Sequence, residues 1–291
     1  LEHKLRANND PSQPLSEIIT LVSYVPSDKP VGRPTQYASA GGAGSAENTE
    51  ENIVVISNLS IGSSAAETAH FLNDACQEVA DAINAEAKAA NNATGEAISI
   101  PAHVGQREAL QNLVDETRAR LGQIDILVCN AAVNPFYGSM QELPDDAMDK
   151  ILGVNIKSNH WLVNMVLPEM IERKDGSIII VSSIGGLRGS PVLGAYCISK
   201  AADLQLVRNL AVENGQHNVR VNAISPGLVR TDFARALWEN PDVLKERTAG
   251  DPLKRIGEPR EIAGAAVYLA SAAGSFTTGQ NFVVDGGATI G

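Results

Sequence analysis

From residue 53 onward, short apolar runs alternate with longer stretches in which apolar residues recur at helical spacing. Short runs rich in β-branched residues are typical of strands that are buried on both faces. Such runs predict strands at 53–57, 97–100, 125–129, 177–181, 219–224 and 281–284. The periodic stretches predict helices at 66–91, 107–121, 144–172, 195–214, 231–239 and 259–272. This alternation predicts an α/β fold, with a doubly wound, mostly parallel sheet covered by helices on both faces.

Residues 1–52 have a different composition, rich in Pro, Ser, Asn, Gly and Glu. Prolines at 26, 30 and 34 exclude a regular helix there, and the glycine-rich segment 41–44 indicates a flexible stretch. Only residues 18–25 have the pattern of a strand. We therefore predict an atypical, poorly ordered segment at 1–52 and a single domain at 53–291.

Charge and cysteine content narrow the classes of function. The chain has 34 acidic and 23 basic residues and a net charge of −11, which argues against broad binding to nucleic acid or anionic lipid. No apolar run approaches the roughly 20 residues that cross a bilayer. The three cysteines are scattered, which favours a reducing compartment over a disulfide framework or a zinc site. We expect a cytoplasmic protein without a bound metal.

The sharpest chemical signal is the pair Tyr196 and Lys200 at the start of a predicted helix. A spacing of four residues places both side chains on one helix face. An ammonium group beside a phenol favours the phenolate, so the pKa of the tyrosine is expected to fall from about 10 toward the range of a general acid or base. The pair therefore predicts proton transfer at Tyr196.

Other polar residues are predicted to lie at the same edge of the sheet. Ser183 follows one strand, Asn130 follows another and Ser225 follows a third, while Asn155 lies within a long predicted helix. Ligands of parallel sheets bind beyond the carboxyl ends of the strands, where such residues gather. Several independent polar signals at one edge are more specific than any single motif.

In this order and spacing, the chain resembles the short-chain dehydrogenase/reductase family across about residues 53–287. The matching segments are Asn130-Ala131-Ala132, Asn155, Ser183, Tyr196 with Lys200, Asn222 to Gly227, and Asp285-Gly286-Gly287. Residues 129–135 and 103–105 are most similar to a carbonyl-reductase branch that acts on ketones and aldehydes. The resemblance implies a Rossmann-like sheet and an NAD(P)-dependent oxidoreductase.

The resemblance also implies a role for each of four catalytic residues. Tyr196 would exchange a proton with the substrate oxygen while hydride moves at the adjacent carbon. Lys200 would lower the pKa of the tyrosine and bind the nicotinamide ribose. Ser183 would hold the carbonyl oxygen, and Asn155 would anchor a water chain leading from the lysine.

The implied cofactor is NADP or NAD, with the preference left open. Besides Tyr196 and Lys200, the residues implied to bind it are Val104, Asn130, Ala131, Pro226, Gly227, Val229 and Thr231. The implied substrate is a small, neutral carbonyl or alcohol. The C-terminal stretch resembles the family's subunit interface, so we expect a homotetramer or homodimer.

One expected element is missing from the sequence. A sheet of this kind normally begins with a strand, a TGxxxGxG turn and a helix that together bind the pyrophosphate. Segment 41–44 is too close to residue 53 for the crossover that a parallel pair needs, so the first βα unit is predicted to be missing or replaced. Asn58 stands where an acid or base would select the adenine ribose.

Three interpretations follow from this absence. The chain is an active oxidoreductase whose residues 15–52 rebuild the centre of the sheet, or it has impaired cofactor binding and acts as a scaffold or a partner in an oligomer. The third interpretation is a truncated, inactive family member whose N-terminus is joined to unrelated sequence. Dinucleotide binding separates the first interpretation from the second, and the third predicts that residues 1–52 are sensitive to protease.

Overall fold

The computed structural model describes residues 21–24, 53–56, 77–85 and 97–291. The predictions about poor order in most of 1–52, the glycine-rich segment 41–44 and Asn58 fall outside these residues. The absence of a TGxxxGxG turn and the boundary between two parts of the chain therefore stay predictions.

The sheet has six strands in the order β1-β2-β3-β4-β5-β6. Its strands are β1 (Leu21–Tyr24), β2 (Ile53–Ile56), β3 (Ile126–Cys129), β4 (Gly176–Val181), β5 (Val219–Pro226) and β6 (Asn281–Val284). Strands β2 to β6 pair in parallel, and β1 pairs with β2 in antiparallel orientation. The mostly parallel sheet expected from the sequence is confirmed.

The strand predicted at 97–100 is wrong. Only Ile98 forms a single bridge there, although Ile98 and Ile100 are buried in the core. The side chain of Asn84 accepts a hydrogen bond from the Ala97 amide at 2.8 Å and donates one to the Ala97 carbonyl at 2.9 Å. Because these backbone groups are satisfied by a side chain, they are not available for a strand ladder.

The structure divides the predicted helices more finely. Its helices are α3 (Arg107–Leu121), α4 (Asp145–Leu152), α5 (Ser158–Arg173), α6 (Gly194–Asn214), α7 (Pro241–Thr248), α8 (Pro259–Ala270) and a helix at 77–85. Its 3₁₀ turns are η3 (Ile184–Gly186), η4 (Gly215–His217), η5 (Asp232–Leu237) and η6 (Ala272–Gly274). The helix predicted at 144–172 is interrupted by a π-helical turn, η2 (Gly153–Lys157). The helix predicted at 231–239 is the 3₁₀ turn η5, and α7 was not anticipated.

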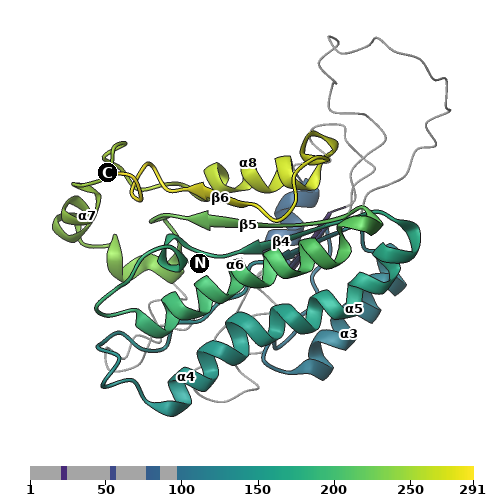
Figure 1. Cartoon of the computed structure of the whole chain (residues 1–291), viewed down its shortest axis with the longest axis horizontal. Helices are drawn as coiled ribbons and strands as arrows, with labels where there is room; N and C mark the ends of the chain where they lie inside the picture. Colours follow the sequence, from purple (N-terminus) through teal and green to yellow (C-terminus); the bar gives the residue numbers. More distant parts are fainter. Residues whose placement is uncertain (1–20, 25–52, 57–76, 86–96) are drawn as a thin grey trace, which may run out of the picture.

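Helices cover both faces of the sheet, as Figure 1 shows. Side chains alternate across β3, so Leu127 and Cys129 face the core beneath α3, α5 and α6. Ile126 and Val128 face the opposite way, toward Leu269 of α8. Burial on both faces explains why the central strands are almost entirely apolar.

Within the part of the chain that the structure describes, no helix combines the length and apolar character needed to cross a membrane.

Candidate active site

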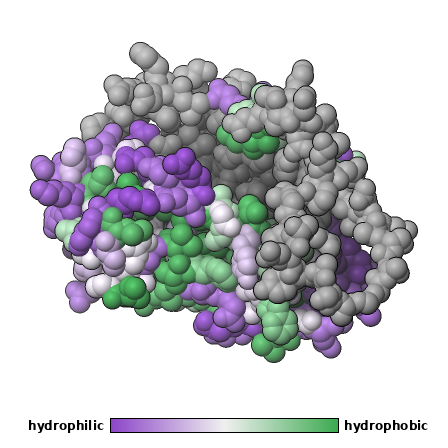
Figure 2. All heavy atoms as spheres, turned by 90° about the horizontal axis from the view of Figure 1, so that it is seen from above, coloured by the Kyte–Doolittle hydropathy of each residue, from purple (hydrophilic) through white to green (hydrophobic). Residues whose placement is uncertain are grey.

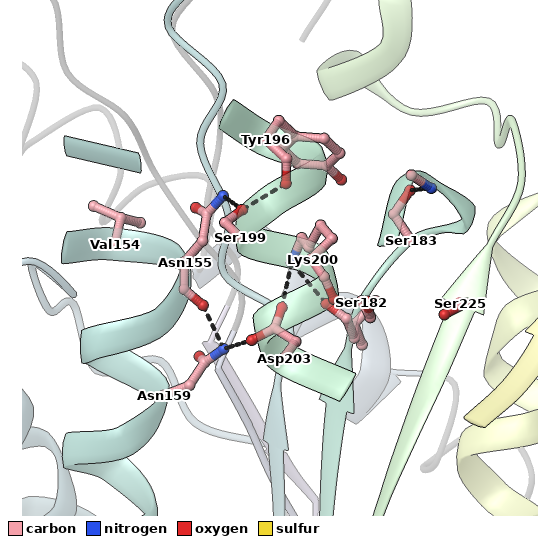
Figure 3. Close-up of polar contacts among 12 residues, drawn as sticks. Val154, Asn155, Asn159, Ser182, Ser183, Tyr196, Ser199, Lys200, Asp203 and Ser225 are labelled. Carbon is pink, nitrogen blue, oxygen red and sulfur yellow. Dashed lines mark hydrogen bonds and ion pairs between the residues drawn. The ribbon is translucent and has the colours of Figure 1, made fainter. Parts of the chain in front are cut away.

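Tyr196 and Lys200 lie one turn apart at the start of α6, beside the carboxyl end of β4 (Figure 3). The ammonium nitrogen Nζ of Lys200 is 5.9 Å from the centroid of the Tyr196 ring. The structure therefore brings the two residues of the strongest sequence motif together on one helix face.

The ammonium of Lys200 is held inside the protein. Its Nζ donates to the main-chain oxygen of Val181 at 2.8 Å and lies 3.1 Å from Oδ2 of Asp203. The side chains of Lys200 and Asp203 are 1% and 0% exposed. Burial, the largest single effect, opposes the charge on Lys200. The attraction and hydrogen bond of Asp203, together with the interactions with Tyr196 and Cys129, outweigh burial, and the pKa of Lys200 lies above its usual value.

Ser183 reaches the same place from β4. Its Oγ accepts a hydrogen bond from the Gly185 amide at 3.0 Å as the chain enters η3. A Cβ atom built on Gly185 would lie 3.4 Å from Ser183 Oγ and 3.6 Å from Cε1 of Tyr196. Because both side chains lie against this one position, the hydroxyl of Ser183 and the ring of Tyr196 are neighbours.

Asn155 is fully buried within the π-helical turn η2. Its Oδ1 accepts from the Val133 amide at 2.8 Å, and its Nδ2 donates to the Val133 carbonyl at 3.1 Å and to Ser199 Oγ at 2.9 Å. Ser199 Oγ in turn donates to the main-chain oxygen of Tyr196 at 2.7 Å. Asn155 thus joins the segment after β3 to the first turn of α6. Single π-helical turns are frequent at functional sites.

The residues implied to bind the nicotinamide half gather after β5. The amide of Gly227 donates to the Val284 oxygen at 3.0 Å, and a Cβ on Gly227 would lie 2.8 Å from the Cα of Asp285. Pro226 ends β5, Val229 forms a bridge with Gly257, and Thr231 precedes η5. Close contact with the C-terminal stretch therefore fixes the path of this segment.

The other implied cofactor residues lie in two loops. Asn130 is exposed at the carboxyl end of β3, and Ala131 beside it is buried. Val104 is buried in the turn before α3. Phe233 of η5 covers the tyrosine, with ring centroids 6.0 Å apart.

Comparison with known proteins assigns the fold and site to a family. The family model described as enoyl-(acyl carrier protein) reductase matches residues 55–289. Dehydrogenase/reductase SDR family member 4 of Bos taurus is 46% identical over 196 residues, which cover 66% of this chain and 70% of that protein. The human protein of the same name is 41% identical over 199 residues, which cover 66% and 70% of the two chains. This chain belongs to the short-chain dehydrogenase/reductase family.

Solved structures of short-chain dehydrogenases/reductases share the Rossmann-like fold. A gluconate 5-dehydrogenase from Burkholderia cenocepacia J2315, in complex with NADP and tartrate, matches with a TM-score of 0.62 and 30% identity, covering 65% of this chain and 73% of that one. A short-chain type dehydrogenase/reductase from Mycobacterium marinum matches with a TM-score of 0.67 and 34% identity, covering 75% and 83%. Membership of the family makes the chain an oxidoreductase of the dehydrogenase/reductase type.

Two buried polar residues of this dehydrogenase/reductase site escaped the sequence reasoning. Asn159 donates through Nδ2 to Oδ1 of Asp203 at 3.0 Å and to the main-chain oxygen of Asn155 at 2.7 Å. Asp203 lies three residues after Lys200, and Asn159 lies four residues after Asn155. Both spacings could be seen in the sequence. Such pairs usually lie on solvated helix faces, so spacing alone did not distinguish them.

Substitution of Gly186 tests the contact between η3 and α6. A Cβ on Gly186 would lie 2.7 Å from the main-chain carbon and oxygen of Lys200, so Gly186→Ala is expected to push Ser183 away from Tyr196. We expect a loss of about 1–3 kcal/mol in the free energy of unfolding, as for other overpacked sites, and a lower kcat/KM. Denaturant unfolding and steady-state kinetics measure both. Gly215→Ala is the matched control, because nothing lies within 4 Å of an added Cβ at this position, which follows the C-terminal end of α6. Equal effects of the two substitutions would contradict the prediction.

Proposed function

We propose that this short-chain dehydrogenase/reductase interconverts a carbonyl compound, a ketone or aldehyde, and an alcohol, using NADP or NAD. The observation that carries the proposal is the arrangement of Tyr196, Lys200 and Ser183. A phenol, a buried ammonium and a hydroxyl converge at the carboxyl end of β4, where parallel sheets bind ligands. This set of groups is suited to proton transfer at a carbonyl oxygen.

Three side chains would act on the carbonyl oxygen during reduction. Ser183 Oγ would donate a hydrogen bond to this oxygen and orient it toward Tyr196. The Tyr196 hydroxyl would give its proton to the oxygen as negative charge develops there, and in alcohol oxidation the tyrosinate would take the proton back. Lys200 would stabilise the tyrosinate, because its ammonium is fixed one turn away.

The residues present fit a nicotinamide dinucleotide. Lysine has three N–H donors, and the contacts of Lys200 with Val181 and Asp203 account for two of them, so the third can bind a ribose hydroxyl. Residues 226–231 would hold the nicotinamide end, where their path is fixed against the C-terminal stretch. When bound, the dinucleotide supplies or accepts the hydride at the carbonyl carbon. The remaining implied contacts are those of Val104, Asn130 and Ala131.

Dinucleotide titration tests this function directly. We expect saturable binding of NADPH or NADH, followed by the change in nicotinamide fluorescence. The gluconate 5-dehydrogenase relative is a complex with NADP, which supports NADPH as the first ligand to test. Absence of binding of either dinucleotide at millimolar concentration would reject the proposal and favour the scaffold or inactive interpretation.

Substrate choice is proposed to lie in residues 133–140, 184–194 and 228–258, which flank Tyr196. Their exposed apolar side chains suit a small, neutral carbonyl compound or alcohol; among them are Tyr137, Met140, Leu187 and Phe233. A hydrogen bond of 3.1 Å from Arg247 of α7 to the Tyr137 hydroxyl connects two of these segments. Steady-state kinetics with a neutral ketone and with a carboxylated ketone test this proposal. We expect the higher kcat/KM for the neutral ketone.

Self-association is proposed to occur through the side of the molecule that carries α8 and β6. Figure 2 views this side, on which hydrophobic surface is gathered. Exposed apolar residues of this part of the chain include Val267 of α8, Val283 of β6, and Phe276 in the segment between these two elements. Apolar surface of this kind is typical of interfaces, and it supports a homodimer or homotetramer.

A further inference from the structure

A buried carboxylate lies beside the proposed catalytic pair. Tyr196, Lys200 and Asp203 follow one another at i, i+4 and i+7, so they lie along one face of α6. Both carboxylate oxygens of Asp203 are engaged, Oδ2 by the ammonium of Lys200 at 3.1 Å and Oδ1 by the Nδ2 group of Asn159 at 3.0 Å (Figure 3). A charged side chain with no exposure needs such partners to remain charged.

We propose that Asp203 is a positioning residue that keeps Lys200 charged and fixes its ammonium one turn from Tyr196. This inference rests on the proposed function, since the use of the ammonium is to stabilise the tyrosinate.

The orientation of Asp203 is fixed from α5 through Asn159. Its Nδ2 donates both to Asp203 and to the Asn155 oxygen, while its Oδ1 has no hydrogen-bond partner among the described residues, although it is buried. Leaving a buried acceptor unpaired costs free energy. The amide is nevertheless oriented to give both protons to these two acceptors. A chain of side chains therefore runs from Lys200 through Asp203 and Asn159 to the π-helical turn that holds Asn155.

Electrostatics supports this role for Asp203. Burial alone would lower the pKa of Lys200, and the attraction of Asp203 raises it. The other titratable groups that act on Lys200 are Tyr196 and Cys129. Burial raises the pKa of the Cys129 thiol, so this thiol stays neutral and does not replace Asp203 as a counter-charge.

Asp203→Asn tests the inference because it removes the charge and nearly keeps the shape. The buried ammonium of the variant is expected to lose its proton several pH units earlier, as unpaired buried lysines do. For carbonyl reduction, we expect kcat/KM of the variant relative to the wild type to be similar near pH 6 and to fall at least about tenfold by pH 9. Glu213→Gln is the matched control, since it removes an exposed acid from the same helix.

A second measurement uses the wild-type chain and needs no turnover. NMR of protein labelled at lysine Cε follows the titration of Lys200 directly, with Asp203→Asn as the comparison where it folds. A midpoint for loss of the Lys200 proton at or above pH 10.5, the ordinary lysine value, supports the inference in the wild type, and a midpoint below that value overturns it. A ratio of kcat/KM in the folded variant that does not change with pH also overturns it. Because the NMR titration is independent of catalysis, failure of this inference and failure of the proposed function are distinguishable.

Discussion

Tyr196→Phe is expected to lower turnover by about 10²–10⁴-fold, the usual contribution of a general acid or base, while dinucleotide affinity stays nearly unchanged. The substitution removes only the hydroxyl. The ring keeps its contact with Phe233, and Lys200 keeps its contacts with Val181 and Asp203. The loss should therefore appear in kcat and leave binding of the dinucleotide intact. Steady-state kinetics and fluorescence titration with NADPH or NADH measure the two quantities separately.

A second tyrosine provides the control for this experiment. Tyr268 lies on α8, where its hydroxyl is 3.0 Å from Thr277 Oγ1, and α8 covers the face of the sheet opposite α6. Tyr268→Phe removes the same chemical group and should retain turnover. Full activity in Tyr196→Phe would show that another group transfers the proton.

Lys200→Met is expected to lower the free energy of unfolding by about 3–5 kcal/mol at pH 7, because it leaves a buried carboxylate without its ion-pair partner. Asp203 has no exposed surface, so water cannot replace the lysine. The double variant Lys200→Met, Asp203→Leu removes both charges and should recover most of the lost stability. Denaturant unfolding of the wild type and both variants measures this difference.

The penalty in Lys200→Met should also depend on pH. Burial raises the pKa of Asp203 above its ordinary value, although Lys200 and Asn159 both lower it, so loss of the lysine leaves burial opposed only by the hydrogen bond from Asn159. The folded variant then binds a proton that the unfolded chain, with an ordinary pKa of 3.8, has already released. Stability of the variant is therefore lost as pH rises above this value, and the penalty at pH 5 should be smaller than at pH 7, by at most about 1.4 kcal/mol for each pH unit. Equal penalties at the two pH values would exclude a buried, ionised Asp203.

Much of the fold could be read from local pattern. The runs around Ile178 and Val221 are apolar because central parallel strands are buried on both faces, and this burial leaves a clear mark in the sequence. Residues 97–100 show the same pattern, but the side chain of Asn84 satisfies the backbone of Ala97. A contact between residues so far apart in the chain cannot be recognised from the local sequence pattern.

The π-helical turn could not be predicted from the sequence for a related reason. The apolar positions of residues 144–172 fit a continuous helix. The π-helical turn η2 within this stretch depends on the contacts of Asn155 with Val133 and Ser199. Likewise, Tyr196 and Lys200 could be found from their spacing, whereas Asp203 could not. An acid three residues from a lysine usually lies in solvent, whereas Asp203 is buried in the folded chain, where Asn159 of α5 contacts it.

The exposed side chains around Tyr196, such as Tyr137, Met140 and Leu187, contrast with the enclosed bonds of Asn155 and Lys200. Exchange of one surface side chain for another breaks no interior bond and costs little folding free energy. Selectivity can therefore diverge among descendants of this chain while the residues proposed to transfer the proton are inherited unaltered.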